Sequence, residues 1–241
     1  MRIKKFLLRV SFLVLTLATP ALSTPIFASE KDADALYHAF NFEAGVGSTD
    51  DGVDLAHWDF DGWIGTDENK LWLKSIGKRE KQVTEQAEFW ALYSRNIGTF
   101  WDVQVGVRHD TQIDPLTYGV IGFEGLAPYF FETHAYLFLS EDGDFSARIK
   151  TGNEFLITQK LLIHPYIEAN LFAQDVPELE VGAGLSNVEL GIQTRYELTR
   201  SFAPYIDLKY ERKLGETSSI AKSHGKSDDA FVGILGVKFL F

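Results

Sequence analysis

Apolar and polar side chains alternate along many segments of this chain, and this alternation sharply limits the folds open to it. In the segment TFWDVQVGVRHD, every second residue from Trp101 to Val107 is apolar, and the residues between them are polar or glycine. Side chains on a strand point alternately to opposite faces, so the segment has one apolar and one polar face. The same pattern recurs in 55–64, 130–140 and 186–198. The chain is therefore predicted to be all-β.

Turn signals between the alternating runs delimit the strands. The run from 79 to 95 has a charge density that suits a helix as well as a strand, and both interpretations stay open. With that run counted as a strand, about twelve are predicted: 36–46, 55–64, 69–79, 84–95, 99–110, 116–126, 130–140, 144–156, 161–173, 186–198, 202–214 and 229–241.

The connections between these strands differ in length. Short joints such as NIGT and LAPYF alternate with mostly longer polar loops such as GETSSIAKSHGKSDD. An even number of strands, with short turns at one end and longer loops at the other, is typical of bacterial outer-membrane barrels. Aromatic residues near the strand ends fit the girdles of such barrels; they are Tyr93, Phe100, Trp101, Tyr129 and Tyr205.

The last strand, FVGILGVKFLF, raises the question of what covers its apolar face and its edge. A water-soluble sandwich or lipocalin-like barrel would turn this face inward, and alternation alone does not exclude that. A membrane covers it with lipid, while pairing with the first strand removes the edge. The strand number and an apolar strand ending at Phe241 favour the membrane. Residues 29–241 are thus predicted to form a transmembrane antiparallel β-barrel of about 12 strands.

Residues 1–28 have the pattern of a secretory signal peptide. Arg2, Lys4 and Lys5 precede an apolar run that is too short for a comfortable transmembrane anchor, and small residues follow. Removing this segment takes away four basic residues and no acidic ones, which changes the formal charge from −11 to about −15. Export to the cell outer membrane is expected, and nucleic acid is excluded as a partner because phosphate binding needs a cationic surface. The chain has no cysteine, so disulfides cannot close the fold.

If the apolar faces contact lipid, the polar faces line the lumen, and any metal site lies there. The only methionine, Met1, belongs to the signal segment, so imidazole and carboxylate ligands suited to Cu(II) or Zn(II) remain. His134, Glu154 and His164 fall on three consecutive predicted strands, and a tight hairpin at 141–144 would place both histidines near Gly152, about 10 Å apart. A shift of one step would place Lys150 there instead. Histidines that are simply paired inside the lumen are the alternative.

Motifs for catalysis are missing from the sequence. There is no nucleophile elbow, no metalloprotease helix and no glycine loop of the kind that holds phosphate. The chain is therefore expected not to be an enzyme, although an outer-membrane enzyme that acts on lipid or peptide stays open as a different class.

Several segments resemble the copper resistance protein B family, from about residue 55 to Phe241. The segments include LYSRNIGTFWDVQVGVRHD, GFEGLAPYFFETHAYLFLSEDGDFSARIK and GAGLSNVELGIQTRYELTRSFAPYIDLKYERKLGET. The resemblance implies an outer-membrane barrel that aids copper resistance by binding Cu(II) or passing copper ions, with a periplasmic multicopper oxidase as companion. Many members carry a Met- and His-rich segment before the barrel, whereas SEKDADAL at 29–36 has neither residue. A general channel or structural barrel without specific metal binding is the alternative.

Overall fold

The computed structural model describes residues 35–80, 83–111 and 115–241, so the predicted signal peptide lies outside the described residues. Most of this part is strand, in agreement with the alternation. The strands are β1 (Tyr37–Thr49), β2 (Asp54–Gly65), β3 (Asn69–Glu80), β4 (Val83–Gly98), β5 (Trp101–Asp110), β6 (Leu116–Ala127), β7 (Phe131–Ser140), β8 (Phe145–Gly152), β9 (Phe155–Leu156), β10 (Leu161–Phe172), β11 (Gly184–Tyr196), β12 (Phe202–Lys213) and β13 (Asp229–Leu240).

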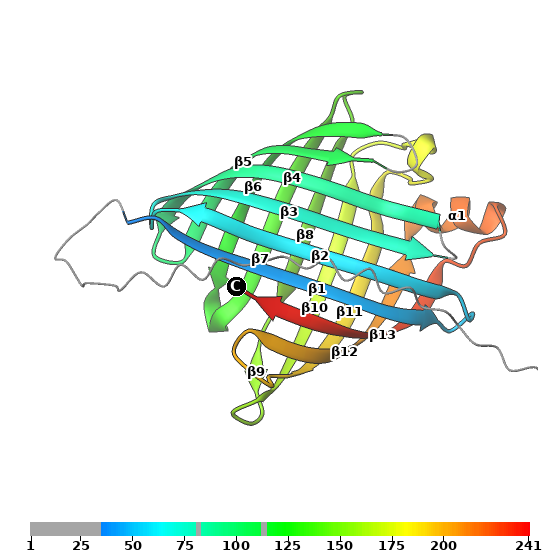
Figure 1. Cartoon of the computed structure of the whole chain (residues 1–241). Coiled ribbons are helices and arrows are strands. Elements are labelled where there is room, and N and C mark those ends of the chain that lie inside the picture. Colours follow the sequence, from blue (N-terminus) through cyan, green and yellow to red (C-terminus); the bar gives the residue numbers. More distant parts are fainter. Residues whose placement is uncertain (1–34, 81–82, 112–114) are drawn as a thin grey trace, which may run out of the picture. The chain divides into compact units, whose positions relative to one another are not determined.

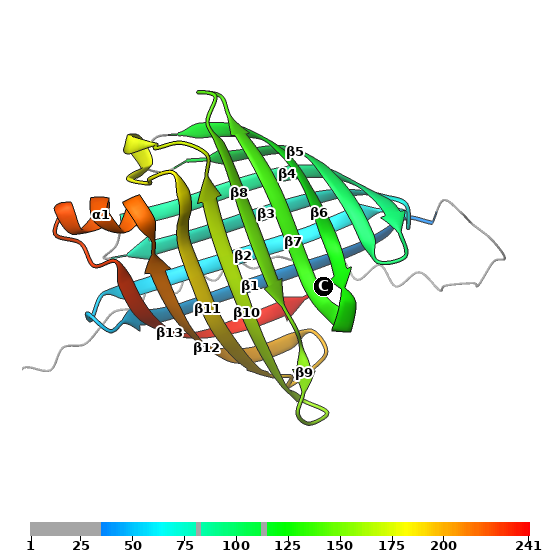
Figure 2. The same ribbon diagram turned by 180° about the vertical axis from the view of Figure 1, so that it is seen from behind.

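The strands close into an antiparallel barrel (Figure 1). Strands that follow one another in sequence are paired, except β8 and β9, and β1 pairs with β13 from Asn41↔Leu240 to Thr49↔Val232. Because β8 and β9 both pair with β10, they share one position, and the thirteen strand segments make a barrel of twelve positions. Figure 2 shows the opposite wall, from β6 to β12. The predicted fold class and strand number are confirmed.

The outer surface of the barrel is apolar and its lumen is polar. On β12, Leu208 is 62% exposed and the adjacent Asp207 is 7% exposed; on β4, Phe89 is 49% exposed and the adjacent Glu88 is 1% exposed. The apolar face of each strand therefore points outward, as in barrels whose belt contacts lipid. A water-soluble barrel would have the opposite arrangement.

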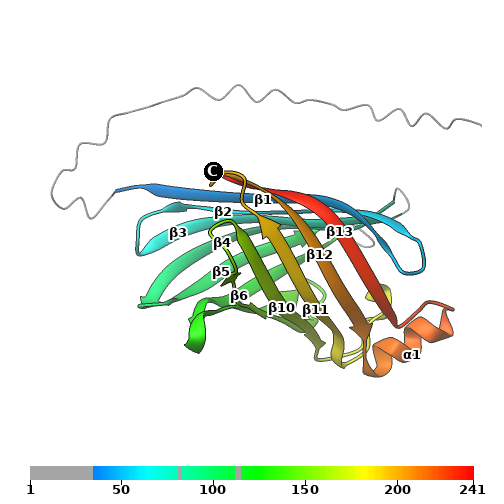
Figure 3. The same cartoon turned by 90° about the horizontal axis from the view of Figure 1, so that it is seen from below.

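The two ends of the barrel differ. The end that carries short turns includes η1 (Pro128–Phe130), whereas the other end carries η2 (Pro177–Leu179) and α1 (Gly215–Ser223), seen beyond the strands in Figure 3. By the usual rule the short turns face the periplasm and the longer loops face outward. Within the described residues, no helix has the length and apolar run that a membrane span requires.

Two loops at the outer end hold each other in place. The amide of Gly182 donates to Thr217 Oγ1 of α1 at 3.0 Å. Lys226 donates to Glu180 at 2.5 Å, and the other Glu180 oxygen lies 3.1 Å from His224 Nδ1. The hydrogen bond from Lys226, assisted by His224, holds the pKa of Glu180 below its usual value. These contacts join α1 and the residues that follow it to the loop after β10.

One strand prediction is confirmed, and two expectations for individual elements are corrected. Within the run from 79 to 95, residues 83–95 belong to β4, so the strand is confirmed and the helical alternative was wrong. The predicted strand 144–156 is interrupted at Asn153 and Glu154, between β8 and β9. The polar loop after β12 contains the helix α1, which was not predicted because its hydrophobic side chains are few.

Candidate functional site

A cavity of about 260 Å³ occupies part of the lumen. Its lining is strongly charged, with more acidic than basic side chains. The acidic members are Glu43, Asp59, Glu132, Glu154, Glu168, Glu189 and Asp207, the basic members are Lys78, Arg148, Lys150, Lys209 and Lys238, and the histidines are His57 and His164. Seven carboxylates against five cations leave an excess of two negative charges when both histidines are neutral. Such a lining favours cations over anions.

Alternation on neighbouring strands brings the charged groups together across the lumen. Glu43 on β1 accepts a 2.8 Å contact from Lys238 on β13, its register partner. Its other oxygen accepts a hydrogen bond from Gln193 Nε2 on β11 at 2.9 Å. Since β12 and β13 lie between β11 and β1, this bond spans the curvature of the wall. The Glu43 carboxylate is therefore fully engaged.

A glycine in the barrel wall leaves space for a tyrosine ring to reach a histidine inside the lumen. Tyr205 on β12 and His57 on β2 are joined by a 3.0 Å contact between the Tyr hydroxyl and Nε2. Tyr205 is 3% exposed and points into the lumen, so its expected place in the aromatic girdle was wrong. The Tyr205 ring passes over Gly236, where an added Cβ would lie 2.4 Å from Cζ. The other nitrogen of His57, Nδ1, is buried and has no hydrogen-bond partner among the described residues. Tyr205 therefore holds the imidazole through Nε2, and Nδ1 keeps its hydrogen-bonding capacity unused among the described residues.

Three carboxylates of the cavity have unused capacity. Asp207 accepts a hydrogen bond from the Tyr166 hydroxyl at 2.9 Å through Oδ2, but its buried Oδ1 has no partner in the described part of the chain. Asp59 and Glu132 make no ion pair with any other residue that the structure describes. Buried polar groups are normally satisfied, so unengaged oxygens in a cavity indicate a place for water or a cation.

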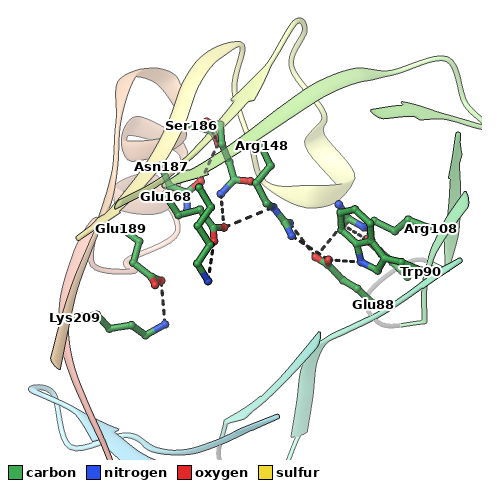
Figure 4. A network of polar contacts seen from close by, with 12 residues as sticks. Glu88, Trp90, Arg108, Arg148, Glu168, Ser186, Asn187, Glu189 and Lys209 are labelled. Atoms are coloured by element: carbon green, nitrogen blue, oxygen red, sulfur yellow. Dashed lines mark hydrogen bonds and ion pairs between the residues drawn. The ribbon is translucent and has the colours of Figure 1, made fainter. Parts of the chain in front are cut away.

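Ion pairs also cross the interior of the barrel, as Figure 4 shows for Glu88 and Arg148. Glu88 on β4 accepts hydrogen bonds from Arg148 on β8 at 3.0 and 3.1 Å and from Trp90 Nε1 at 3.0 Å. Arg108 on β5 lies 3.1 Å from the same carboxylate. Because β4 and β8 are four positions apart in the barrel, the Glu88–Arg148 pair crosses the interior. Arg148 is also 3.6 Å from Glu168, at the edge of the cavity.

A second network joins β3, β5, β6 and β7. Lys74 on β3 donates to Glu124 on β6 at 2.9 Å and to the Tyr136 hydroxyl on β7 at 2.8 Å. The Tyr136 hydroxyl donates to Gln104 on β5 at 2.8 Å. An apolar cluster inside the barrel packs against both networks; it consists of Trp90, Leu92, Tyr118, Val120, Tyr136 and Phe138. Polar and apolar side chains therefore pack against each other in this part of the lumen.

The structure does not gather His134, Glu154 and His164 into one ligand set. His134 lies opposite Lys150, and its Nδ1 is 3.3 Å from Glu124, while Glu154 is paired with Arg195 at 2.5 Å. No group of three His, Cys, Asp or Glu side chains in 35–80, 83–111 and 115–241 is arranged to hold a metal ion.

The difference comes from one hairpin. His164 lies beside Gly152 as expected, but the partner of Gly152 on β7 is Glu132 and not His134. The turn closes with the Ser140 amide donating to the Asp144 carbonyl at 2.9 Å, helped by Gly143 at φ 95°. Closure at this pair fixes the register of β7 on β8 and places Lys150 opposite His134, the shift that would remove the predicted site.

Sequence reasoning placed most of these residues on the inner face but missed how they engage. Alternation places Asp207, His57 and Lys150 on the polar faces of their strands, the faces expected to line the lumen. Nothing in the sequence showed that Tyr166 would bond one oxygen of Asp207, or that Tyr205 would bond one nitrogen of His57. Each contact joins strands that are far apart in sequence.

A closed barrel of twelve positions with an apolar belt and a charged lumen defines this protein as an outer-membrane β-barrel. Solved barrels support this class. The NanC porin superimposes with a TM-score of 0.57 at 12% identity, over 83% of this chain and 98% of that chain. The KdgM porin superimposes with a TM-score of 0.53 at 9% identity, with the same coverage. At these identities the likeness shows the fold alone.

The family follows from the sequence comparisons. The model of the family "Copper resistance protein B precursor (CopB)" matches residues 38–241. Copper resistance protein B of Escherichia coli is 37% identical over 185 residues, which is 76% of this chain and 62% of that protein. The homolog from Pseudomonas syringae pv. tomato is 34% identical over 192 residues, 79% of this chain and 65% of that protein. The chain belongs to the copper resistance protein B family, and the matches span less than two thirds of these relatives.

Proposed function

We propose that this protein is exported to the cell outer membrane and contributes to copper resistance by letting copper ions bind in, and pass through, its lumen. The observation that carries the proposal is the cavity, which combines an excess of carboxylates with His57 and His164 in a member of this family. Imidazole and carboxylate are ligands that suit Cu(II). The role is not enzymatic.

The proposed binding is weak. Within the described residues no three ligands converge, so a copper ion would contact one or two side chains at a time and keep part of its water. Weak binding at several sites is what passage requires, because an ion that enters must also leave. A periplasmic multicopper oxidase, the companion that the family implies, is proposed as a partner on the inner side.

Copper retention and growth test the proposal together. We expect the purified barrel to retain Cu(II) in equilibrium dialysis. The double variant His57→Ala, His164→Ala should bind Cu(II) about tenfold more weakly, because loss of a metal ligand lowers affinity at least as much as loss of a residue that hydrogen-bonds a ligand. The same variant should fail to restore growth of a deletion strain on high copper. His224→Ala is the matched control, since His224 is exposed on the outer loop.

Unchanged growth across a copper series, together with no retained metal in the wild-type protein, would contradict the proposal. That result would support the second candidate, a general channel or structural barrel without metal specificity. The observation in favour of this candidate is that the described residues contain no three-ligand group. Such a barrel would show the same ion conductance in planar bilayers with and without copper.

A further inference from the structure

Lys150 is the least firmly paired of the basic residues that form ion pairs inside the lumen. Its Nζ lies 4.0 Å from Glu168, at the limit of an ion pair, and its side chain is 42% exposed. The other lumenal cations in ion pairs have side chains between 10% and 24% exposed, and each makes at least one contact of 3.1 Å or less. The Lys150 ammonium therefore stands largely free inside the barrel.

The position of Lys150 sets this head group at the wall of the cavity. On β8 it lies opposite His134 of β7 and opposite Glu168 of β10. Its Nζ is 5.1 Å from the centroid of the Tyr166 ring, which provides a cation–π contact but no hydrogen bond. The amine is held loosely, by an aromatic face and a distant carboxylate.

The charges around the cavity act on this amine from several strands. Glu168 on β10, Asp59 on β2, Glu189 on β11 and Glu43 on β1 line the same cavity as this amine. Asp59 has no ion-pair partner of its own in the part of the chain that the structure describes. Asp207 independently indicates a position for a cation in this cavity. Its carboxylate belongs to the same lining and is 7% exposed, and its Oδ1 has no hydrogen-bond partner among the described residues.

We propose that the Lys150 ammonium is a tethered counter-ion of the lumen, with which a solute cation competes for the carboxylates of the cavity. Lys150 thereby sets how strongly the lumen prefers cations. The inference deepens the proposed function, on which it rests for the passage of cations, but it concerns cations in general. Replacing Lys150 with a neutral residue changes the excess charge of the lining from −2 to −3.

Ion selectivity in planar bilayers tests the proposal. In a KCl gradient, the reversal potential of Lys150→Gln should show a K⁺/Cl⁻ permeability ratio roughly fivefold above the wild-type value, as one unit charge acting over several ångströms of hydrated lumen predicts. Lys160→Gln is the matched control: it removes the same charge from an exposed turn outside the cavity and should leave the ratio unchanged. A Lys150→Gln ratio equal to that of the wild type would overturn the inference.

A second readout needs no conduction. Mn²⁺ prefers oxygen ligands, so equilibrium dialysis against Mn²⁺ reports the competition with the ammonium directly. Lys150→Gln should retain more Mn²⁺ than the wild type and Lys160→Gln; equal retention in all three would contradict the proposal even in a barrel that carries no current. Because neither readout uses copper, loss of the copper phenotype and failure of the counter-ion role are separate results.

Discussion

Replacing Glu88 with glutamine is expected to lower the free energy of unfolding of the barrel by about 3–5 kcal/mol. The carboxylate is 1% exposed and engages Arg148, Arg108 and the Trp90 indole. Glutamine keeps the size of the side chain but removes its charge, so among the described residues Arg148 keeps only its 3.6 Å contact with Glu168, and Arg108 keeps only Asp110, as carboxylate partner. Urea unfolding in lipid vesicles, followed by tryptophan fluorescence, measures the change.

Glu178→Gln is the control for this experiment. Glu178 lies exposed in η2 on the outer loop, so losing its charge should change the unfolding free energy by no more than about 0.5 kcal/mol. If the two variants unfold at the same urea concentration, the Glu88 network does not stabilise the lumen in the way the contacts indicate.

Replacing Leu208 with arginine should cost about 2–4 kcal/mol if the outer face of β12 lies in the middle of the bilayer. Leu208 is the seventh residue of the strand Phe202–Lys213 and is 62% exposed, so no protein contact explains the cost. The penalty comes from placing a cation in hydrocarbon. The same vesicle-based unfolding measurement gives its size.

Leu198→Arg provides the comparison for Leu208→Arg. Leu198 is 50% exposed in the turn between β11 and β12, at the end of the barrel, where the cost of arginine should fall to about 0–1 kcal/mol. Equal costs at both positions would mean that depth in the membrane does not matter, which is incompatible with a lipid-facing belt.

The strands were predictable because both faces of the sheet carry a clear signal. On β5, the polar residues Gln104 and Arg108 point into the lumen and Val105 and Val107 point outward, as the alternation indicates. The ends of the strands were predictable to within a few residues because Gly, Pro and Asp cluster in the turns. Lipid on one side and a charged lumen on the other leave little ambiguity about which face is which.

The parts that were not predictable depend on contacts between distant segments. The helix α1 is held through Thr217, whose hydroxyl accepts a bond from the loop before β11. Tyr129 and Phe130 adopt left-handed backbone angles, φ 66° and 63°, in the three-residue turn η1. Non-glycine residues rarely adopt such angles, so the local sequence predicts neither.

The candidate site shows the same limit. Alternation assigned His134, Glu154 and His164 to the lumen, and the Cα pairing of β7, β8 and β10 is consistent with that assignment. Whether they meet depended on the register of a single hairpin, which the turn at Gly143 decides. Charge pairs such as Glu88 with Arg148 join residues 60 positions apart, and one sequence contains no signal for them.

Accessibility of spin labels on neighbouring residues of β11 tests most directly whether the apolar face meets lipid and the polar face is enclosed. The chain has no cysteine, so Ile192→Cys and Gln193→Cys each provide one unique attachment point. In membranes, the label at 192 should collide mainly with dissolved oxygen and the label at 193 mainly with a water-soluble nickel complex. The reverse order, or equal collision with nickel at both positions, would contradict the barrel described above.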